Sequence, residues 1–306
     1  MAIVSPASPF ARSEFDGGVA ELTRLGFVPV HDDSVFAREA GYLSGTAELR
    51  AEAFMRHWSD PSVAALIAVR GGFGSVHLLP LLDRDRIRAT PKLFIGYSDN
   101  TSLMSWLTCQ CGLTALHGPM LDRRLSRGAP GYDESSFLAL ARGGRGLVLA
   151  PDGLLVLRDG EATGPMFGGT LTQLVSSLGT PYAFDPPDRC VLFIEDVNER
   201  PFRIDRMLTQ LRLSGVMSRA SALVFGEMRG CDEPHGTPSI RSGGQGGGVT
   251  ARAVVERFVR DFDGPVLYGF PSGHTSGPCW TIPLGVEVRV SVRPHPSLTV
   301  EEAPVA

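Results

Sequence analysis

The sequence lacks several features that would point to particular classes of protein. No stretch interleaves clustered basic residues with aromatic ones and the net charge is −4, so nucleic acid is not expected as a partner. The longest apolar run, residues 63–69, is far too short to span a bilayer, and a membrane is not expected as a partner either. The first residues carry no charged segment and soon reach Pro6, which predicts that they are not a secretory signal.

Patterns typical of metal sites and disulfide frameworks are also lacking. The five cysteines are an odd number and include no Cys-x-x-Cys pair, which favours reduced thiols in a cytoplasmic protein. The seven histidines are far apart and no His-Glu-x-x-His motif occurs, so nothing favours metal-dependent hydrolysis. Neither a metal nor another cofactor is expected.

What the sequence does contain is an alternation of apolar strands and helical patterns. With 43% hydrophobic residues in 306, the chain can form one large domain or two of ordinary size. The first part predicts a doubly wound, mostly parallel α/β domain over residues 1–121. Its expected strands lie at 2–4, 27–30, 64–69 and 92–95, and its expected helices at 15–25, 48–58, 74–82 and 101–111.

The composition changes after residue 121. Residues 122–163 are rich in Arg, Gly and Asp and are interpreted as a connector with short strands at 147–149 and 154–157. A second α/β domain is predicted over 164–306. Its expected helices lie at 170–178, 201–214 and 251–262, and its expected strands at 191–194, 222–225 and 266–268, with an extended region at 282–292. The glycine-rich stretch 242–248 lacks the Lys-Ser/Thr of a phosphate-binding loop and is interpreted as a surface insertion.

One turn, Gly96-Tyr97-Ser98-Asp99-Asn100, lies between an apolar strand and a helical pattern. A strand that turns at once into a helix exposes the side chain at the turn, and the first N–H groups of the helix point to the same place. Ser98 is therefore either the N-cap of the helix or an activated nucleophile beside an oxyanion site. This stretch alone favours the cap.

Two more polar residues follow apolar strands in the second half. Glu195 ends the strand 191–194, and His274 lies shortly after the strand 266–268. Each has an ordinary explanation, because an acid can favour the start of a helix and a loop histidine is usually structural. Together with Ser98, however, they supply the nucleophile, base and orienting carboxylate of a serine hydrolase. Glu199 is a weaker candidate for the acid.

The chain resembles the LD-carboxypeptidases, serine peptidase family S66, which includes muramoyltetrapeptide carboxypeptidases and microcin C self-immunity peptidases. The similar stretches span nearly the whole chain in the order of the family. They lie at 2–8, 70–74, 96–99, 117–120, 168–171, 193–197, 203–208 and 269–274. The resemblance implies that the C-terminal domain is the smaller one and that the active site lies in the cleft between the domains.

The resemblance also implies roles for single residues. Ser98 would be the nucleophile, Glu195 the acid and His274 the base, with an oxyanion hole from the N–H groups of Gly72 and Asp99. The substrate would be a small peptide that loses a C-terminal D-amino acid, and its free carboxylate predicts a cation in the cleft. The candidates for substrate binding are Arg70, Gly71, Thr170, Arg203, Arg206 and Trp280.

Several alternatives stay open at this point. Arg203 and Arg206 can instead pair with Asp205 or Glu199 on the surface, and Thr170 stands where Asn is expected in the family. The leading hypothesis is the release of D-alanine from a murein tetrapeptide during peptidoglycan recycling. A self-immunity peptidase cleaving a peptidyl-nucleotide would need an aromatic platform, for which Trp280 is the candidate. The third hypothesis is a non-catalytic binding protein. A homodimer is expected from the resemblance alone.

Overall fold

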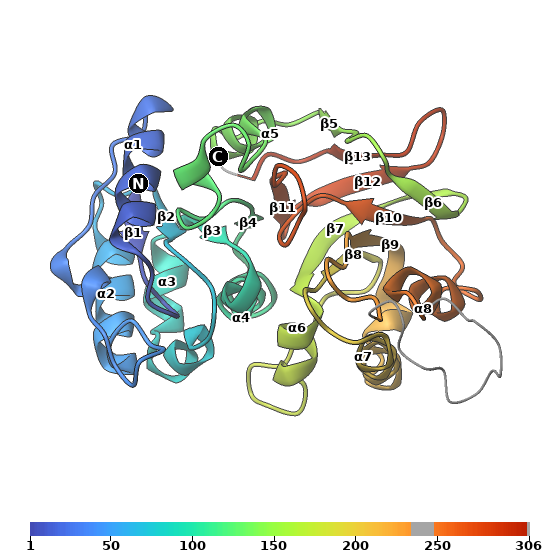
Figure 1. Cartoon of the computed structure of the whole chain (residues 1–306), viewed down its shortest axis with the longest axis horizontal. Coiled ribbons are helices and arrows are strands. Elements are labelled where there is room, and N and C mark those ends of the chain that lie inside the picture. Colours follow the sequence, from blue (N-terminus) through green and yellow to red (C-terminus); the bar gives the residue numbers. More distant parts are fainter. Residues whose placement is uncertain (234–247, 305–306) are drawn as a thin grey trace.

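The computed structural model describes residues 1–233 and 248–304, and shows two sheets side by side with helices around them (Figure 1). The first sheet has the strand order β1-β2-β3-β4-β11. The first four strands are parallel, and the last runs antiparallel to β4. Their bounds are β1 (Ala2–Val4), β2 (Ala65–Ala68), β3 (Leu93–Gly96), β4 (Ala115–His117) and β11 (Ile282–Leu284).

The second sheet has the order β5-β13-β12-β7-β8-β9-β10-β6. Strands β7 to β10 are parallel, while both flanks of the sheet are antiparallel. The bounds are β5 (Leu147–Leu149), β6 (Leu155–Arg158), β7 (Glu161–Thr170), β8 (Cys190–Glu195), β9 (Ala220–Gly226), β10 (Val266–Phe270), β12 (Glu287–Ser291) and β13 (Ser297–Val300). The predicted α/β class is confirmed, and the second sheet has more strands than the first.

The α-helices lie on the outer sides of the two sheets and between them (Figure 1). Their bounds are α1 (Arg12–Arg24), α2 (Ala47–Ser59), α3 (Arg84–Ala89), α4 (Thr101–Ser105), α5 (Glu134–Ala141), α6 (Leu171–Ser177), α7 (Pro201–Leu213) and α8 (Ala251–Phe258). Shorter helical segments are η1 (Asp33–Phe36), η2 (Ser75–Leu81), η3 (Ser98–Asn100), the π-helical η4 (Trp106–Gln110), η5 (Leu125–Arg127) and η6 (Met217–Arg219). No helix in the described ranges is long and apolar enough to cross a membrane.

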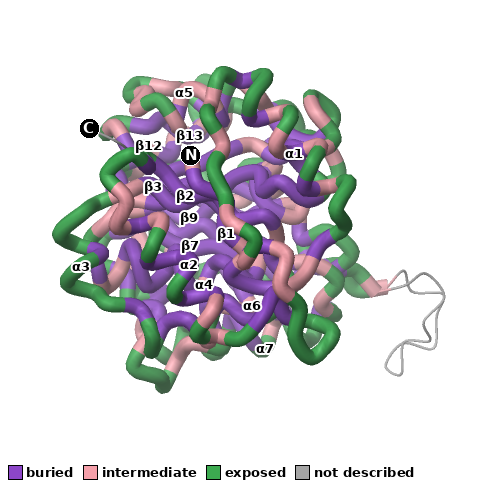
Figure 2. Tube along the Cα trace, turned by 90° about the vertical axis from the view of Figure 1, so that its left-hand side faces the viewer, coloured by how far each residue is buried: buried purple, intermediate pink, exposed green. Residues whose placement is uncertain are grey.

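Side chains on the two faces of the second sheet pack in different apolar clusters, and one of these clusters also contains the strands of the first sheet. Leu192 and Ile194 of β8 pack in the cluster formed with α6, α7 and α8. Val191 and Phe193 point to the opposite face and belong to the same cluster as the strands of the first sheet. Figure 2 shows the strands as a buried interior beneath exposed loops. The two sheets are therefore held by a shared apolar core.

Not every prediction about local structure is confirmed. The strand expected at 27–30 is reduced to a single bridge between Val30 and Ala2. The helical stretch expected at 101–111 is confirmed, although it changes from α-helix to π-helix after Ser105. The strand β7 was not expected before residue 170, and α5 lies in the predicted connector. The insertion expected at 242–248 lies, apart from Gly248, outside the described residues.

Candidate active site

Ser98 lies in the tight turn that follows β3. Its φ of 64° is in the left-handed region, which costs a residue other than glycine about 1–3 kcal/mol and occurs mostly at functional sites. The side chain is half-buried, and it does not cap the following helix, since η3 begins after Tyr97 without a side-chain cap. The alternative that Ser98 is an ordinary N-cap is therefore not what the structure shows.

The turn is fixed by its two neighbours. Asp99 Oδ2 accepts a hydrogen bond from Ser75 N at 2.8 Å, and Ser75 Oγ donates to the Asp99 carbonyl at 2.6 Å. Asn100 Nδ2 donates to the carbonyls of Arg70 and Tyr97 at 3.2 and 3.3 Å. Asp99 and Asn100 do not cap the start of the following helix. They connect the turn to the neighbouring loop instead.

Two glycines of that neighbouring loop, residues 70–74, lie close to serine side chains, Gly71 to Ser98 and Gly72 to Ser8. A Cβ on Gly71 would lie 2.8 Å from Ser98 Cβ and 3.3 Å from Asp99 N. A Cβ on Gly72, whose φ is 103°, would lie 2.3 Å from Ser8 Oγ. Ser8 holds the loop, because its Oγ accepts from Phe73 N at 3.0 Å and its N donates to the Gly71 carbonyl at 3.2 Å. The opening segment of the chain thus positions this loop, a role that the sequence did not indicate.

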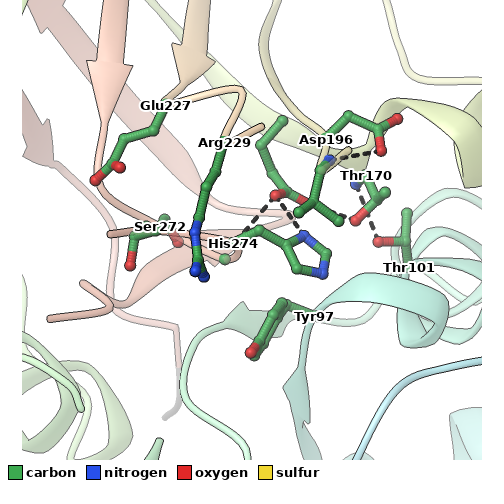
Figure 3. A network of polar contacts seen from close by, with 12 residues as sticks. Tyr97, Thr101, Thr170, Asp196, Glu227, Arg229, Ser272 and His274 are labelled. Atoms are coloured by element: carbon green, nitrogen blue, oxygen red, sulfur yellow. Dashed lines mark hydrogen bonds and ion pairs between the residues drawn. The ribbon is translucent and has the colours of Figure 1, made fainter. Parts of the chain in front are cut away.

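Glu195 and His274 form a hydrogen-bonded pair, and Figure 3 shows His274 within this network of polar contacts. Glu195 Oε2 lies 2.8 Å from His274 Nδ1 and also accepts from the His274 backbone N at 3.1 Å. The Thr170 hydroxyl donates to the other carboxylate oxygen. Glu195 is 1% exposed, and a Cβ on Gly273 would lie 2.9 Å from its Cδ. The carboxylate therefore fixes both the position of the imidazole and the nitrogen that carries its proton.

The pair has shifted pKa values. Burial alone raises the pKa of Glu195, but the charge and hydrogen bond of His274, with smaller effects from His117 and Thr170, lower it to about 2. Burial lowers the pKa of His274, and the charge and hydrogen bond of Glu195 outweigh this, so that it is raised from its ordinary value. An ionised carboxylate therefore accompanies His274 over the whole range in which the imidazole titrates.

Arg124, a residue of the predicted connector, holds the loop that carries His274. Its guanidinium is buried and donates to the carbonyls of Gly273 at 2.8 Å, Thr275 at 3.2 Å and Gly277 at 3.1 Å. The same side chain lies near the hydroxyl of Tyr97, whose ring packs edge-on against His274 at 5.1 Å between centroids. The sequence did not distinguish Arg124 from the other arginines of the connector.

His117, at the end of β4, was not predicted as a site residue. It is completely buried, and its Nδ1 lies 2.9 Å from Ser272 Oγ. Burial lowers its pKa to about 4, although the nearby charge of Glu195 acts in the opposite direction. A neutral His117 therefore packs behind the pair of Glu195 and His274 and supports their loop.

A cavity of about 600 Å³ lies above these groups. Ser98 and His274 both line it, although no hydrogen bond joins their side chains, as is common when no substrate is bound. Its remaining lining residues are Arg70, Gly71, Gly72, Tyr97, Met120, Asp122, Arg123, Val197, Asn198, Arg229 and Gly230. The amide N–H groups of Gly72 and Asp99 take no part in the turn and loop hydrogen bonds of the described residues. Within those residues, no group of three or more metal-ligating side chains occurs.

Four of the other predicted residues lie away from the cavity wall. Arg203 pairs with Glu199 at 3.4 Å on the exposed side of α7, so neither residue contacts His274. Arg206 is exposed on the same helix. Trp280 is half-buried against the core. The simpler explanation of Arg203 as a partner of a surface carboxylate therefore agrees with the structure.

The chain matches two family models over most of its length. The LD-carboxypeptidase N-terminal domain matches residues 1–118, and the LD-carboxypeptidase C-terminal domain matches residues 163–290. A probable murein peptide carboxypeptidase of Bacillus subtilis (strain 168) is 31% identical over 299 residues, covering 94% of this chain and 88% of that protein. The chain therefore belongs to the LD-carboxypeptidase family of serine peptidases, and the resemblance seen in the sequence is confirmed.

Two solved structures extend the comparison to the fold. The muramoyltetrapeptide carboxypeptidase from Oxalobacter formigenes superposes with a TM-score of 0.83 at 26% identity, covering 99% of each chain. The microcin C7 self-immunity protein MccF, in complex with aspartyl sulfamoyl adenosine, superposes with a TM-score of 0.85 at 25% identity, covering 100% of this chain and 96% of that one. The fold is thus shared with members of the family that carry two different names.

Proposed function

We propose that the protein is an LD-carboxypeptidase that releases the C-terminal D-alanine of murein tetrapeptides. The observation that carries the proposal is the buried Glu195–His274 pair, which lines one cavity together with a strained, half-exposed Ser98. In the proposal Ser98 comes from an N-terminal domain of residues 1–121, and the other two come from a C-terminal domain of residues 164–306. The family membership makes the protein an enzyme, so the hypothesis of a non-catalytic binding protein is not retained.

In the proposed mechanism, Ser98 Oγ attacks the carbonyl carbon of the bond to the D-residue while His274 Nε2 takes its proton. The carbonyl oxygen becomes an oxyanion that the N–H groups of Gly72 and Asp99 stabilise. His274 then gives the proton to the departing amine, the C–N bond breaks, and an acyl-enzyme remains. A water molecule, deprotonated by His274, attacks the ester and releases the shortened peptide and Ser98. Glu195 stays ionised and stabilises the imidazolium at each transfer.

A second candidate is supported by the likeness to MccF. A self-immunity peptidase acting on an aminoacyl or peptidyl-nucleotide would use the same three residues. Trp280 does not line the cavity, so it does not supply the aromatic platform expected for that substrate. This favours the murein peptide. We further propose that the protein is cytoplasmic, because all five cysteines are free thiols, and that it forms the homodimer that the family resemblance implies.

The test compares the two substrates directly. Purified protein is incubated with L-Ala–D-Glu–diaminopimelate–D-Ala and, separately, with aspartyl sulfamoyl adenosine, and the products are identified by mass spectrometry. We expect D-alanine and the tripeptide from the first and little turnover of the second, with no product from Ser98→Ala. An untouched tetrapeptide with a cleaved nucleotide would support the second candidate, and products from Ser98→Ala would remove the proposed nucleophile.

A further inference from the structure

The cavity beside Ser98 carries three arginines, and they differ in their surroundings. Arg70 Nε lies 3.4 Å from Asp122 Oδ2, and Arg123 Nε lies 3.8 Å from the other oxygen of the same carboxylate. Arg70 and Arg123 thus share the single carboxylate of Asp122 on one wall of the cavity. Arg229, which follows β9 in the second domain, has no acidic side chain within 4 Å among the described residues. The neighbouring Glu227 accepts from Ser276 N at 2.9 Å instead.

The segment that carries Arg229 is held in one shape. Arg229 bridges to Val197 as in a parallel ladder, and its carbonyl accepts from Asn198 N at 2.9 Å. Met228 and Asn198 both have positive φ values, of 50° and 57°. A Cβ on Gly230 would lie 2.3 Å from Asn198 Oδ1, so only glycine fits there. The turn therefore presents a charged, exposed side chain from a preorganised backbone.

The position of the departing amino acid in the proposed mechanism indicates which arginine of the cavity lies near its carboxylate. His274 must protonate the departing amine, so the C-terminal residue of the substrate lies next to the imidazole. In that C-terminal residue, the carboxylate carbon is only two bonds away from the departing amine nitrogen. Figure 3 shows Arg229 extending from its strand end toward the region of His274 and Tyr97, and both Arg229 and His274 line the cavity.

We propose that Arg229 binds the C-terminal carboxylate of the departing amino acid and so makes the enzyme a carboxypeptidase rather than an endopeptidase. This inference rests on the proposed function. A guanidinium without a competing acid can bind a carboxylate through two N–H groups, whereas Arg70 and Arg123 are partly neutralised by Asp122. An interior peptide bond would place a neutral amide there and lose the interaction.

The experiment measures kcat/KM for the tetrapeptide and for its C-terminal amide, which differ only in the charge that Arg229 would bind. The wild-type protein should prefer the acid. Arg229→Gln should lower kcat/KM for the acid by about 10- to 100-fold, as expected for one charge-assisted hydrogen bond, and leave the amide nearly unchanged. Arg229→Lys should recover part of the preference for the acid over the amide, because lysine keeps the positive charge but lacks the two adjacent N–H groups of the guanidinium. Arg203→Gln, an arginine outside the cavity, is the matched control.

The possible failures can be told apart. If the wild type cleaves acid and amide equally, or if Arg229→Gln keeps the preference while Arg123→Gln loses it, the assignment of Arg229 is wrong and the carboxypeptidase activity stands. If the wild type cleaves neither peptide, the proposed function fails and this inference fails with it. Thermal unfolding of each variant, expected to match the wild type, separates lost binding from lost folding.

Discussion

Neutralising Glu195 tests the proposed pairing with His274 most sharply. Glu195→Gln keeps the size of the side chain and removes a charge whose oxygen lies 2.8 Å from His274 Nδ1. Two unit charges about 4 Å apart attract by about 4 kcal/mol at an effective dielectric constant of about 20. That energy corresponds to about 3 pH units in the pKa of the imidazole. It also corresponds to a factor of about 10³ in rate, because the transition state contains the imidazolium.

The measurement is the pH dependence of kcat/KM for the tetrapeptide. Only the neutral imidazole accepts a proton from Ser98, so the acid limb of the profile reports the pKa of His274 in the free enzyme. Glu195 raises this pKa above its ordinary value, while burial and Arg124 lower it. Without the carboxylate, burial and Arg124 still lower the pKa of His274, and only the smaller effect of the Asp196 charge still raises it. The acid limb of Glu195→Gln should therefore move to lower pH by up to about 3 units, as the plateau falls by about 10³.

The shift of the acid limb and the fall of the plateau have the same cause, so both must occur together. An unmoved acid limb with a lower plateau would mean that the charge of Glu195 does not act on the group that titrates. A limb moved to higher pH would contradict the sign of the interaction. Glu199→Gln is the matched control, because Glu199 lies four residues later and pairs with Arg203 at 3.4 Å. Its profile should overlay that of the wild type.

Three other substitutions test the surroundings of the site. Gly71→Ala should lower kcat/KM by about 100-fold or more, because the new Cβ would lie 2.8 Å from Ser98 Cβ and 3.0 Å from its Oγ and would displace the serine; unchanged kinetics would contradict this packing. Ser98→Gly should abolish turnover and raise the free energy of unfolding in urea by about 1 kcal/mol, since glycine adopts a φ of 64° without strain; lower stability would contradict the strain. Arg124→Met should lower the free energy of unfolding by about 2–4 kcal/mol, because the carbonyls of Gly273 and Thr275 lose their buried donor. A loss below about 0.5 kcal/mol would show that water replaces the guanidinium as donor.

The positions of Ser98, Glu195 and His274 could be predicted because each follows an apolar strand. Glu195 ends β8 and His274 follows β10, and these strands belong to the parallel part of one sheet, so their carboxyl ends lie at one edge. Ser98 follows β3 of the other sheet, so it meets them only because the two sheets pack together. The contacts of Arg124 could not be predicted in this way. Its acceptors lie about 150 positions later in the chain, and only the fold brings them together. The acceptors of Arg124 are main-chain carbonyls, and because every residue has one, the sequence does not indicate which carbonyls are bonded.

Strand β7 was missed for a related reason. Its sequence contains Gly164, Pro165, Gly168 and Gly169, which argue locally against a strand. The strand forms because β8 and β12 pair with it on both sides, so tertiary pairing overrides local preference. The glycines are required by close approach, since a Cβ on Gly168 would lie 1.9 Å from the Phe193 carbonyl oxygen. The residues that weakened the prediction are thus the ones that allow β7 to lie beside β8.

Backbone strain gathers around the cavity in a way that follows from this topology. Ser98, Asn198 and Met228 are left-handed residues other than glycine, and they follow β3, β8 and β9 in turn. Each belongs to a sharp turn at the carboxyl end of a buried strand, and such conformations cost about 1–3 kcal/mol each. The strands can hold them because both faces of β8 and β9 are packed in apolar clusters. The two cores thus stabilise a site whose turns would not adopt these conformations alone, and the proposed nucleophile and the proposed carboxylate anchor are fixed before any substrate arrives.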